Sequence, residues 1–497
     1  MKPVTMMTAN ASRAGGARSG RWLATALAAG LVLAACANDD GAEPTDDTAP
    51  AAPEPIDSDP PTTAEAQDAT DAETTPTASD FEPTTLTMWT PITDQVGREA
   101  FQPLLQRCEA ENPWLTIEFV GKDDIPLALS AAVEAGDPPD IVQADLTGRL
   151  AAIQAAELVV SVTGLAERDG LDWEAFVPAG VQLLEFNGER YGLPFSLDTV
   201  ALFYNQDVLD EIGVDGPPET LDELLTDAEK LLVVSDDGTV ERVGFVPDVG
   251  DGSYAVYFGD MFGASLSSAD GTTITIGETI DQWIEAAQWQ KQFYDLIDAD
   301  EFARWADGLG SYDSADNFFI DGQLPLYFES SFFVTWPDRF VEGRPEGWGA
   351  VPMPVPGGVD EENPASLVPS GNWFMIPNGV DDVEKSWAAL KCLALASEEI
   401  ASFQEFFGNI PSNIEALDLF EEATVAELPE FETFIDLARS NNASVPGSSL
   451  VSGALNDEMN VLLLEHRRGD VSDDQLRDDL LALSDRYQDE LDLELGN

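Results

Sequence analysis

Strand and helix patterns alternate along the chain from residue 86 to residue 144, and this alternation restricts the fold more than any single motif. Residues 86–90 form an apolar strand pattern, and a helical pattern follows over 94–110. Two more strand patterns, at 115–120 and 140–144, are separated by a second helical pattern. Such alternation is typical of an α/β fold with a parallel sheet and right-handed crossovers. Ligands of these sheets bind beyond the carboxyl ends of the strands, a position that falls on Trp89, Thr90, Asp94 and Asp145.

The length of the chain indicates two lobes. Of the 497 residues, 414 follow position 83, whereas single hydrophobic cores stop growing at about 250–300 residues. The stretch 188–205 has the features of a passage between lobes, because a Gly- and Pro-containing segment leads into an apolar strand pattern. The same stretch carries Asp198 between apolar neighbours. Two interpretations of Asp198 stay open here: a solvated residue at a strand entry, or a contact to a ligand.

The N-terminal part of the chain has the pattern of an exported protein. Residues 1–35 combine a basic start with the apolar run 22–35, which is shorter than the ~20 residues that span a membrane. The run ends in Leu33-Ala34-Ala35-Cys36, which resembles the lipobox of bacterial lipoproteins; the alternative is an ordinary signal peptide with an incidental cysteine. Residues 36–83 contain fourteen acidic residues and no Lys or Arg, a composition that does not form a core. We expect a signal peptide, a lipid anchor at Cys36 and an extended acidic tether.

Charge and composition exclude several classes of function. The formal net charge is −71, so nucleic-acid binding, which needs a basic face, is excluded. We interpret the charge as an aid to solubility in salty surroundings, with a halophilic origin as one hypothesis. The single histidine, His466, stands beside two arginines and is predicted to lie on the surface, which excludes Ser-His-Asp catalysis and histidine-based metal sites. No phosphate-binding or dinucleotide fingerprint is present, whereas the many acids leave open a carboxylate pair for glycoside hydrolysis.

Several blocks of the chain, in order, resemble blocks of one known family. Residues 188–195, Gly-Glu-Arg-Tyr-Gly-Leu-Pro-Phe, resemble the first interlobe crossover of the family-1 extracellular solute-binding proteins, the maltose-binding-like receptors of ABC importers. Residues 217–220 (Pro-Pro-Glu-Thr), 370–373 (Ser-Gly-Asn-Trp) and 406–411 (Phe-Phe-Gly-Asn-Ile-Pro) resemble further blocks. The chain departs from the pattern at Leu221, where the family has Trp, and at Pro325-Leu326, where it has Ala-Met. The resemblance extends over about residues 86–491.

The resemblance implies a fold, a location and a set of partners. It implies two α/β lobes, each with a mainly parallel sheet flanked by helices: lobe 1 from 84–194 plus 371–430, and lobe 2 from 195–370 plus 431–497. The chain would be a monomeric lipoprotein on the outer face of the bacterial cytoplasmic membrane. It would capture a sugar or oligosaccharide and deliver it to the permease subunits of an ABC importer, without chemistry, cofactor or metal. Cys108 and Cys392 then fall on two lobe-1 helices, and we predict a disulfide between them.

The resemblance also completes a predicted ligand set. Sugars present apolar C–H faces and a rim of hydroxyls, which aromatic rings and polar side chains recognise. Glu329 lies between aromatic residues, so we expect it to face either the ligand or the solvent. Polyamines, held by carboxylates within an aromatic box, are the alternative ligand. The ring faces are assigned to Trp89, Tyr254, Phe332 and Trp373, the polar rim to Asp145, Asp198, Glu329 and Asn372, and the rest of the set is Thr90, Asp94 and Ser331.

Overall fold

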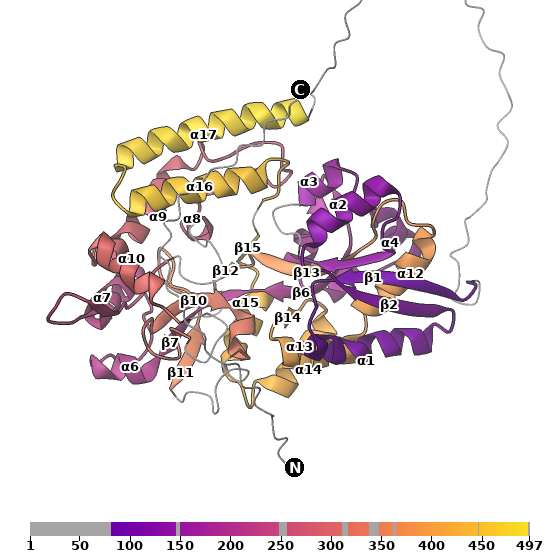
Figure 1. Ribbon diagram of the computed structural model, residues 1–497, viewed down its shortest axis with the longest axis horizontal. Coiled ribbons are helices and arrows are strands. Elements are labelled where there is room, and N and C mark those ends of the chain that lie inside the picture. The colour runs from indigo at the N-terminus through magenta and orange to yellow at the C-terminus, as the bar shows by residue number, and fades with distance from the viewer. Residues whose placement is uncertain are drawn as a thin grey trace, which may run out of the picture. The chain divides into compact units, whose positions relative to one another are not determined.

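The computed structural model describes residues 81–145, 150–247, 256–310, 317–336, 347–360, 364–445 and 447–495. The predicted signal peptide, Cys36 and nearly all of the predicted tether, as well as Tyr254, lie outside these residues. The described part contains two lobes, each built on its own sheet and covered by helices (Figure 1). No helix of this part is both long and apolar enough to cross a membrane.

The sheet of lobe 1 has six strands in the order β14-β6-β13-β3-β1-β2. β1 pairs in parallel with both β2 and β3, whereas β13 runs antiparallel to β3 and β6, and β14 antiparallel to β6. The sheet is therefore mixed, and not mainly parallel as expected. Its strands are β1 (Thr84–Thr90), β2 (Leu115–Gly121), β3 (Ile141–Ala144), β6 (Leu193–Asp198), β13 (Ser370–Met375) and β14 (Ile410–Pro411).

The helices of lobe 1 cover this sheet around an aromatic core. Phe101 on α1, Phe195 on β6 and Phe403 on α13 lie within ring-contact distance of one another, with centroids 5.1–5.8 Å apart. A disulfide joins Cys108 on α1 to Cys392 on α12, with Cα atoms 5.7 Å apart. The elements are α1 (Gln95–Glu111), α2 (Ile125–Ala135), α3 (Leu150–Ala155), α4 (Thr163–Asp169), η1 (Trp173–Ala175), α5 (Pro178–Gln182), the hairpin β4 (Glu185–Phe186) and β5 (Glu189–Arg190), α12 (Val383–Ala394), α13 (Ser397–Phe407) and α14 (Ile414–Thr424).

The sheet of lobe 2 has three strands in the order β10-β7-β11, and both pairings are antiparallel. The two-lobed α/β fold is confirmed, but a mainly parallel sheet in lobe 2 is wrong for the strands that the structure describes. The elements are β7 (Val200–Asn205), α6 (Gln206–Glu211), α7 (Leu221–Leu231), β8 (Val233–Val234), β9 (Val240–Arg242), α8 (Tyr257–Met261), α9 (Ile280–Tyr294), α10 (Ala299–Asp307), β10 (Leu326–Ser330), η2 (Ser331–Val334), β11 (Trp348–Val351), β12 (Ser366–Leu367), α15 (Glu430–Arg439), β15 (Ala443–Ser444), α16 (Ser452–Arg467) and α17 (Asp473–Glu494).

The C-terminal helices α16 and α17 pack on α9 in lobe 2 (Figure 1). Trp283 on α9 is fully buried among apolar residues of these helices. His466 on α16 is also fully buried, and its Nε2 lies 2.7 Å from Oδ1 of Asp473 on α17. The expectation of a surface histidine is therefore wrong, because α17 covers the face of α16 that carries it.

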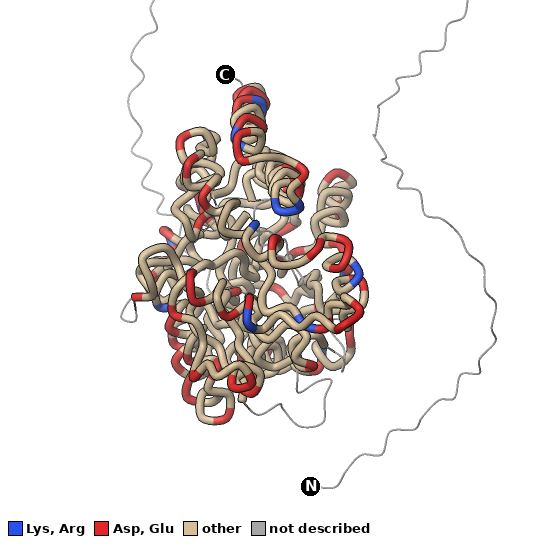
Figure 2. The backbone as a smooth tube through the Cα atoms, turned by 90° about the vertical axis from the view of Figure 1, so that its left-hand side faces the viewer, with Lys and Arg blue, Asp and Glu red and all other residues tan. Residues whose placement is uncertain are grey.

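The chain passes between the lobes at two neighbouring crossovers. β6 belongs to the lobe-1 sheet as far as Asp198, and β7 begins the lobe-2 sheet at Val200, so the first passage lies at Thr199. The expected boundary at residues 194 and 195 is a few residues too early. At the second passage, β12 belongs with lobe 2 and β13 enters the lobe-1 sheet at Ser370, directly opposite Asp198. In the described part of the chain, acidic residues are spread over both lobes, with few Lys or Arg between them (Figure 2).

Candidate functional site

Asp198 connects the two crossovers through its side chain. Its Oδ2 accepts a hydrogen bond from Ser370 Oγ at 2.5 Å, and its Oδ1 accepts one from Asn409 Nδ2. Because Ser370 opens β13 and Asn409 directly precedes β14, the carboxylate ties together the ends of three adjacent lobe-1 strands. The interpretation of Asp198 as a fully solvated residue at a strand entry is therefore wrong.

Three acidic side chains converge where the chain leaves lobe 1. We call Asp145, Asp198 and Glu329 the crossover acids. Burial raises the pKa of Asp198 to about 7; the hydrogen bond from Ser370 opposes this shift, and the charges of Asp145 and Glu329 add to it. Asp145 follows β3 in lobe 1 and is exposed, whereas Glu329 comes from β10 in lobe 2. The crossover acids thus bring side chains from both lobes within electrostatic reach of one another.

Glu329 is fully buried. Its Oε2 accepts a hydrogen bond from Tyr327 OH at 2.5 Å, and its Oε1 accepts one from the backbone N of Ser330 at 2.7 Å. These contacts stabilise a carboxylate that would otherwise be costly to bury. The solvent-facing alternative for Glu329 is therefore wrong.

A chain of polar side chains crosses the lobe-1 sheet beside Asp198. Thr90 Oγ1 donates to Gln143 Oε1 at 2.6 Å, and Gln143 Nε2 donates to Asn372 Oδ1 at 2.9 Å. These residues come from β1, β3 and β13, which are neighbours in the sheet. Thr90 is fully buried and Asn372 half-buried. Thr90 lies at the carboxyl end of β1 as predicted, but its side chain makes a contact within the sheet. Asn372 is the more accessible end of this chain of hydrogen bonds.

The structure corrects several other members of the predicted ligand set. Trp373 is fully buried in the apolar core, so its ring offers no face to a ligand. Asp94 is exposed and caps α1, accepting from Gly97 N at 2.8 Å, as aspartate at a helix N-cap does. Trp89 is half-buried, with Lys122 Nζ 4.3 Å from its ring centroid, so Lys122 covers part of that ring.

Two further members of the set lie on η2 in lobe 2. Phe332 is half-buried, and its ring centroid lies 5.5 Å from that of Trp336. Ser331 is fully buried, and its Oγ has no hydrogen-bond partner in the structure as described. Phe332 is thus packed against a neighbouring ring, and the hydroxyl group of Ser331 is buried and does not face the solvent. Tyr254 lies outside the described residues.

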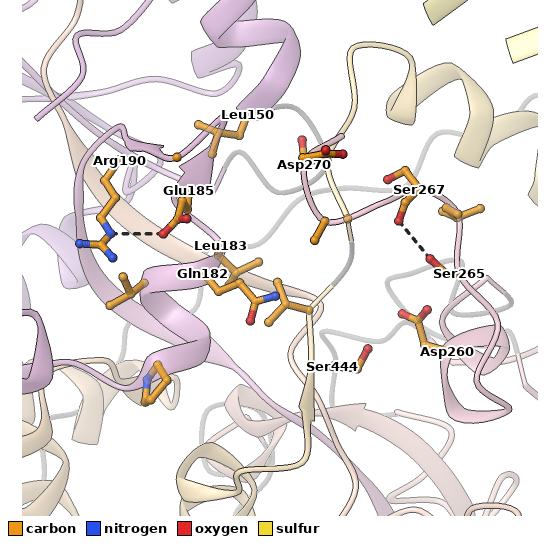
Figure 3. A pocket seen from close by; sticks show the side chains of 18 of the residues that line it. Leu150, Gln182, Leu183, Glu185, Arg190, Asp260, Ser265, Ser267, Asp270 and Ser444 are labelled. Atoms are coloured by element: carbon orange, nitrogen blue, oxygen red, sulfur yellow. Dashed lines mark hydrogen bonds and ion pairs between the residues drawn. The ribbon is translucent and has the colours of Figure 1, made fainter. Parts of the chain in front are cut away.

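A cavity of about 990 Å³ lies between segments of the two lobes. Lobe 1 lines it with the segment from η1 to β5, and lobe 2 lines it with α8, the turn after α8 and residues that follow α15. Figure 3 shows Gln182, Leu183, Glu185 and Arg190 on one side of the opening and Asp260, Ser265, Ser267 and Asp270 on the other. None of the predicted ligand residues that the structure describes lines this cavity.

Tyr257 links the cavity to the crossover acids. It is the first residue of α8 and lines the cavity. Burial raises the pKa of its hydroxyl to about 12, and the charges of Asp145 and Asp260 add to this shift. Asp145 belongs to the crossover acids and Asp260 to the cavity wall, so the two groups of residues are parts of one interlobe region.

The cavity offers an aromatic ring, an amide, hydroxyls and carboxylates. Trp173 is half-buried in its wall, with the guanidinium carbon of Arg190 4.4 Å from the ring centroid. Arg190 Nε also lies 3.4 Å from Glu185 Oε2, so this cation is already engaged by two neighbours. Gln182 is exposed to the cavity and makes no side-chain hydrogen bond within the described part of the chain. These groups are suited to binding a polar ligand by hydrogen bonds and by contact with ring faces.

Sequence reasoning missed these lining residues. Arg190 lies inside the 188–205 stretch and Trp173 in the loop before it, so aromatic and charged residues beside the crossover were a usable signal. Tyr257 stands three residues after Tyr254, which was predicted to face the ligand. Ser265 and Ser267 had no sequence signal, because they lie in an irregular turn that only the fold brings to the cavity.

Comparison with known proteins decides the family. The chain matches the family of bacterial extracellular solute-binding proteins over residues 94–399, which is more than half of its length. It belongs to this family.

Two curated relatives of this solute-binding protein match over part of their length. A maltotriose-binding protein of Pyrococcus abyssi (strain GE5 / Orsay) is 34% identical over 134 residues, which are 27% of each protein. The sn-glycerol-3-phosphate-binding periplasmic protein UgpB of Escherichia coli (strain K12) is 31% identical over 157 residues, which are 30% of this chain and 35% of the relative. The chain thus matches about a quarter to a third of the length of these relatives.

A solved structure covers much more of the solute-binding protein. The structure of CpMnBP1 with mannotriose bound has a TM-score of 0.66 at 22% identity, over 80% of this chain and 99% of that one. At this identity the likeness establishes the fold, which is that of a two-lobed binding protein.

Proposed function

We propose that this solute-binding protein is the receptor of an ABC importer and holds an oligosaccharide in the cavity between its lobes. The observation that carries the proposal is the lining of that cavity by polar side chains from both lobes. Its volume of about 990 Å³ is at the upper end of the ~300–1,000 Å³ typical of small-molecule sites. A sugar of more than one ring is suited to a cavity of this size.

The chemistry of the lining favours a sugar. Trp173 and Tyr257 supply ring faces for the C–H side of a pyranose, and Gln182 and Ser265 supply hydrogen-bonding groups for its hydroxyls. Asp145 extends this polar surface toward the crossover, since it lies within electrostatic reach of Tyr257. The names of the maltotriose-binding relative and of the mannotriose-bound structure agree with this ligand class.

A glycerol phosphate is the competing ligand, because the Escherichia coli relative is named for binding it. Phosphate sites are built from cationic side chains and backbone N–H groups. Arg190 is the sole cation among the described residues that line the cavity, and it already contacts Glu185 and Trp173. The nearby carboxylates would repel a phosphate, so a ligand without negative charge is favoured.

The two crossovers supply the hinge in this proposal. A ligand that touches both lobes binds more tightly to the closed arrangement, and its binding therefore shifts the population toward closure. The permease subunits would recognise the closed form, and the ligand would be released unchanged. We further propose that the protein acts as a monomer, that residues 1–35 direct export, and that Cys36 anchors the chain to the outer face of the membrane through the tether at 36–83.

Isothermal titration calorimetry of the full-length protein tests the proposal. We expect saturable 1:1 binding of maltotriose or mannotriose, no binding of sn-glycerol 3-phosphate, and no release of reducing ends. Gln182→Ala removes a hydrogen bond worth about 0.5–1.5 kcal/mol, so affinity should fall about two- to tenfold. Gln95→Ala, on the exposed side of α1 and away from the cavity, is the matched control and should leave affinity unchanged. Binding of the phosphate in place of the sugars would contradict the proposal.

A further inference from the structure

The charged groups that line the cavity differ in whether the protein or the solvent already supplies each of them with an ion pair, a hydrogen bond or hydration. Glu185 faces Arg190, as described above. Asp270 accepts hydrogen bonds from Ser268 Oγ at 2.6 Å and from Thr272 Oγ1 at 2.8 Å, and these bonds lower its pKa. Glu174 lies at the exposed rim. Each of these groups is neutralised, hydrogen-bonded or hydrated without a ligand.

Asp260 differs from all of them. It lies on α8, lines the cavity and is half-buried, and its carboxyl group points toward the opening in Figure 3. Its side chain makes no hydrogen bond and no ion pair with any described residue of the chain. Burial alone raises its pKa, to about 7, and no cation or hydrogen-bond donor opposes this. Asp260 is therefore a desolvated acid without a counter-charge in the wall of a polar cavity.

A buried carboxylate without a partner is costly unless a cation or donor arrives with the ligand. Among the described residues that line the cavity, the one guanidinium is that of Arg190. It is held by Glu185 and stacked on Trp173, so it does not supply that partner. A protonated amine supplies both a positive charge and up to three N–H donors. Gln182 remains available for hydroxyl groups of the same ligand. Ser265 Oγ donates to the backbone O of Ser267 and accepts from Thr275 Oγ1, so its oxygen has one further acceptor position.

We infer that the cavity takes an amine-bearing saccharide whose ammonium group pairs with Asp260. This inference rests on the proposed function and narrows its substrate class from oligosaccharides in general to amino sugars. The saccharide frame would contact the ring and amide groups of lobe 1, while the ammonium would be held by α8 of lobe 2. A ligand bound in this way connects the two lobes through two different kinds of contact.

The test compares two sugars that differ only at nitrogen. Calorimetry at about pH 6.5 measures the affinity of the full-length protein for the β-1,4 glucosamine trimer and for its N-acetylated form. We expect the free amine to bind at least tenfold more tightly. In Asp260→Asn this preference should disappear through a ten- to hundredfold loss of affinity for the amine. Affinity for the acetylated trimer should stay within about threefold of its wild-type value.

Two further variants show whether the change in affinity comes from Asp260 itself. Asp137→Asn removes an equal charge from an exposed loop of lobe 1 and should preserve the preference for the amine. Asp260→Ala, a second replacement, should lose the preference as Asp260→Asn does. Because the carboxylate is unpaired, both Asp260 variants should unfold at or above the wild-type temperature at neutral pH.

The outcomes separate this inference from the proposed function. Equal binding of both trimers by the wild type, or an unchanged preference in Asp260→Asn, overturns the amine inference and leaves saccharide binding standing. Binding of spermidine as tightly as the glucosamine trimer also overturns it, because the sugar frame would then contribute nothing. Failure of every saccharide to bind overturns the proposed function itself.

Discussion

Replacing Asp198 by Asn should change how the stability of the protein depends on pH. The native pKa of Asp198 is about 7, against an ordinary value of 3.8, so the folded state binds this proton more tightly than the unfolded state does. The contribution of Asp198 to stability is therefore full below about pH 3.8 and is lost as the pH rises through 7. At 1.36 kcal/mol per pKa unit, the loss reaches about 4 kcal/mol in total, of which about 3 kcal/mol falls between pH 5 and pH 8.

Asparagine is suited to this test because it keeps the local contacts. Its Oδ1 can accept from Asn409 and its Nδ2 can donate to Ser370, so both bonds made by Asp198 have a counterpart. The variant carries no charge at this position and therefore lacks the pH-dependent loss. Its stability relative to wild type should rise by about 3 kcal/mol from pH 5 to pH 8.

Urea denaturation of both proteins at pH 5, 6, 7 and 8, at constant salt concentration, measures this difference by linear extrapolation. Acids far from Asp198 are the same in both proteins, so their contributions cancel in the comparison, whereas Asp145 and Glu329 are coupled to Asp198 and belong to the measured difference. Asp137→Asn, in an exposed loop, removes the same charge and is the matched control. If the stability difference between Asp198→Asn and wild type does not change with pH, or if that variant is the less stable protein at pH 8, the desolvation of Asp198 is refuted.

The other predictions concern the disulfide, the lipid anchor and the net charge. In a Cys36→Ser background, the unfolded, non-reduced protein should show no free thiol from Cys108 or Cys392, and two free thiols would rule out the disulfide. Reduction of the disulfide should lower the free energy of unfolding by about 5–6 kcal/mol, because the bond closes a loop across a separation of 284 residues. Cys36→Ser should release the protein from the membrane fraction, and unchanged membrane association would exclude the anchor. Lowering NaCl to about 10 mM should lower the melting temperature, since screening relieves the net charge of −71; an unchanged value would count against this.

The local signals of lobe 1 predict its strands and helices well. The expected strand at 86–90 lies within β1, and α1 begins one residue after Asp94, the residue that starts the helical pattern. These elements follow from apolar periodicity and capping, which are properties of a few neighbouring residues. The antiparallel pairings of β13 and of lobe 2 could not be obtained in this way, because they join segments more than a hundred residues apart.

The site was harder to predict because a residue's place in the chain does not determine which way its side chain points. Asn372 and Trp373 are neighbours on β13, but successive side chains of a strand point to opposite faces. Asn372 contacts Gln143, whereas Trp373 is buried in the core on the other face. Asp94 was expected to contact the ligand, but its bond to Gly97 N shows that it caps α1 instead.

Hydrogen exchange of the full-length protein, with and without a saturating trisaccharide, shows whether one ligand contacts both lobes in the cavity between them. We expect slower exchange in residues 173–190 of lobe 1 and, in the same experiment, in residues 257–270 of lobe 2. Protection confined to one lobe, or protection elsewhere while the sugar binds, would contradict this expectation.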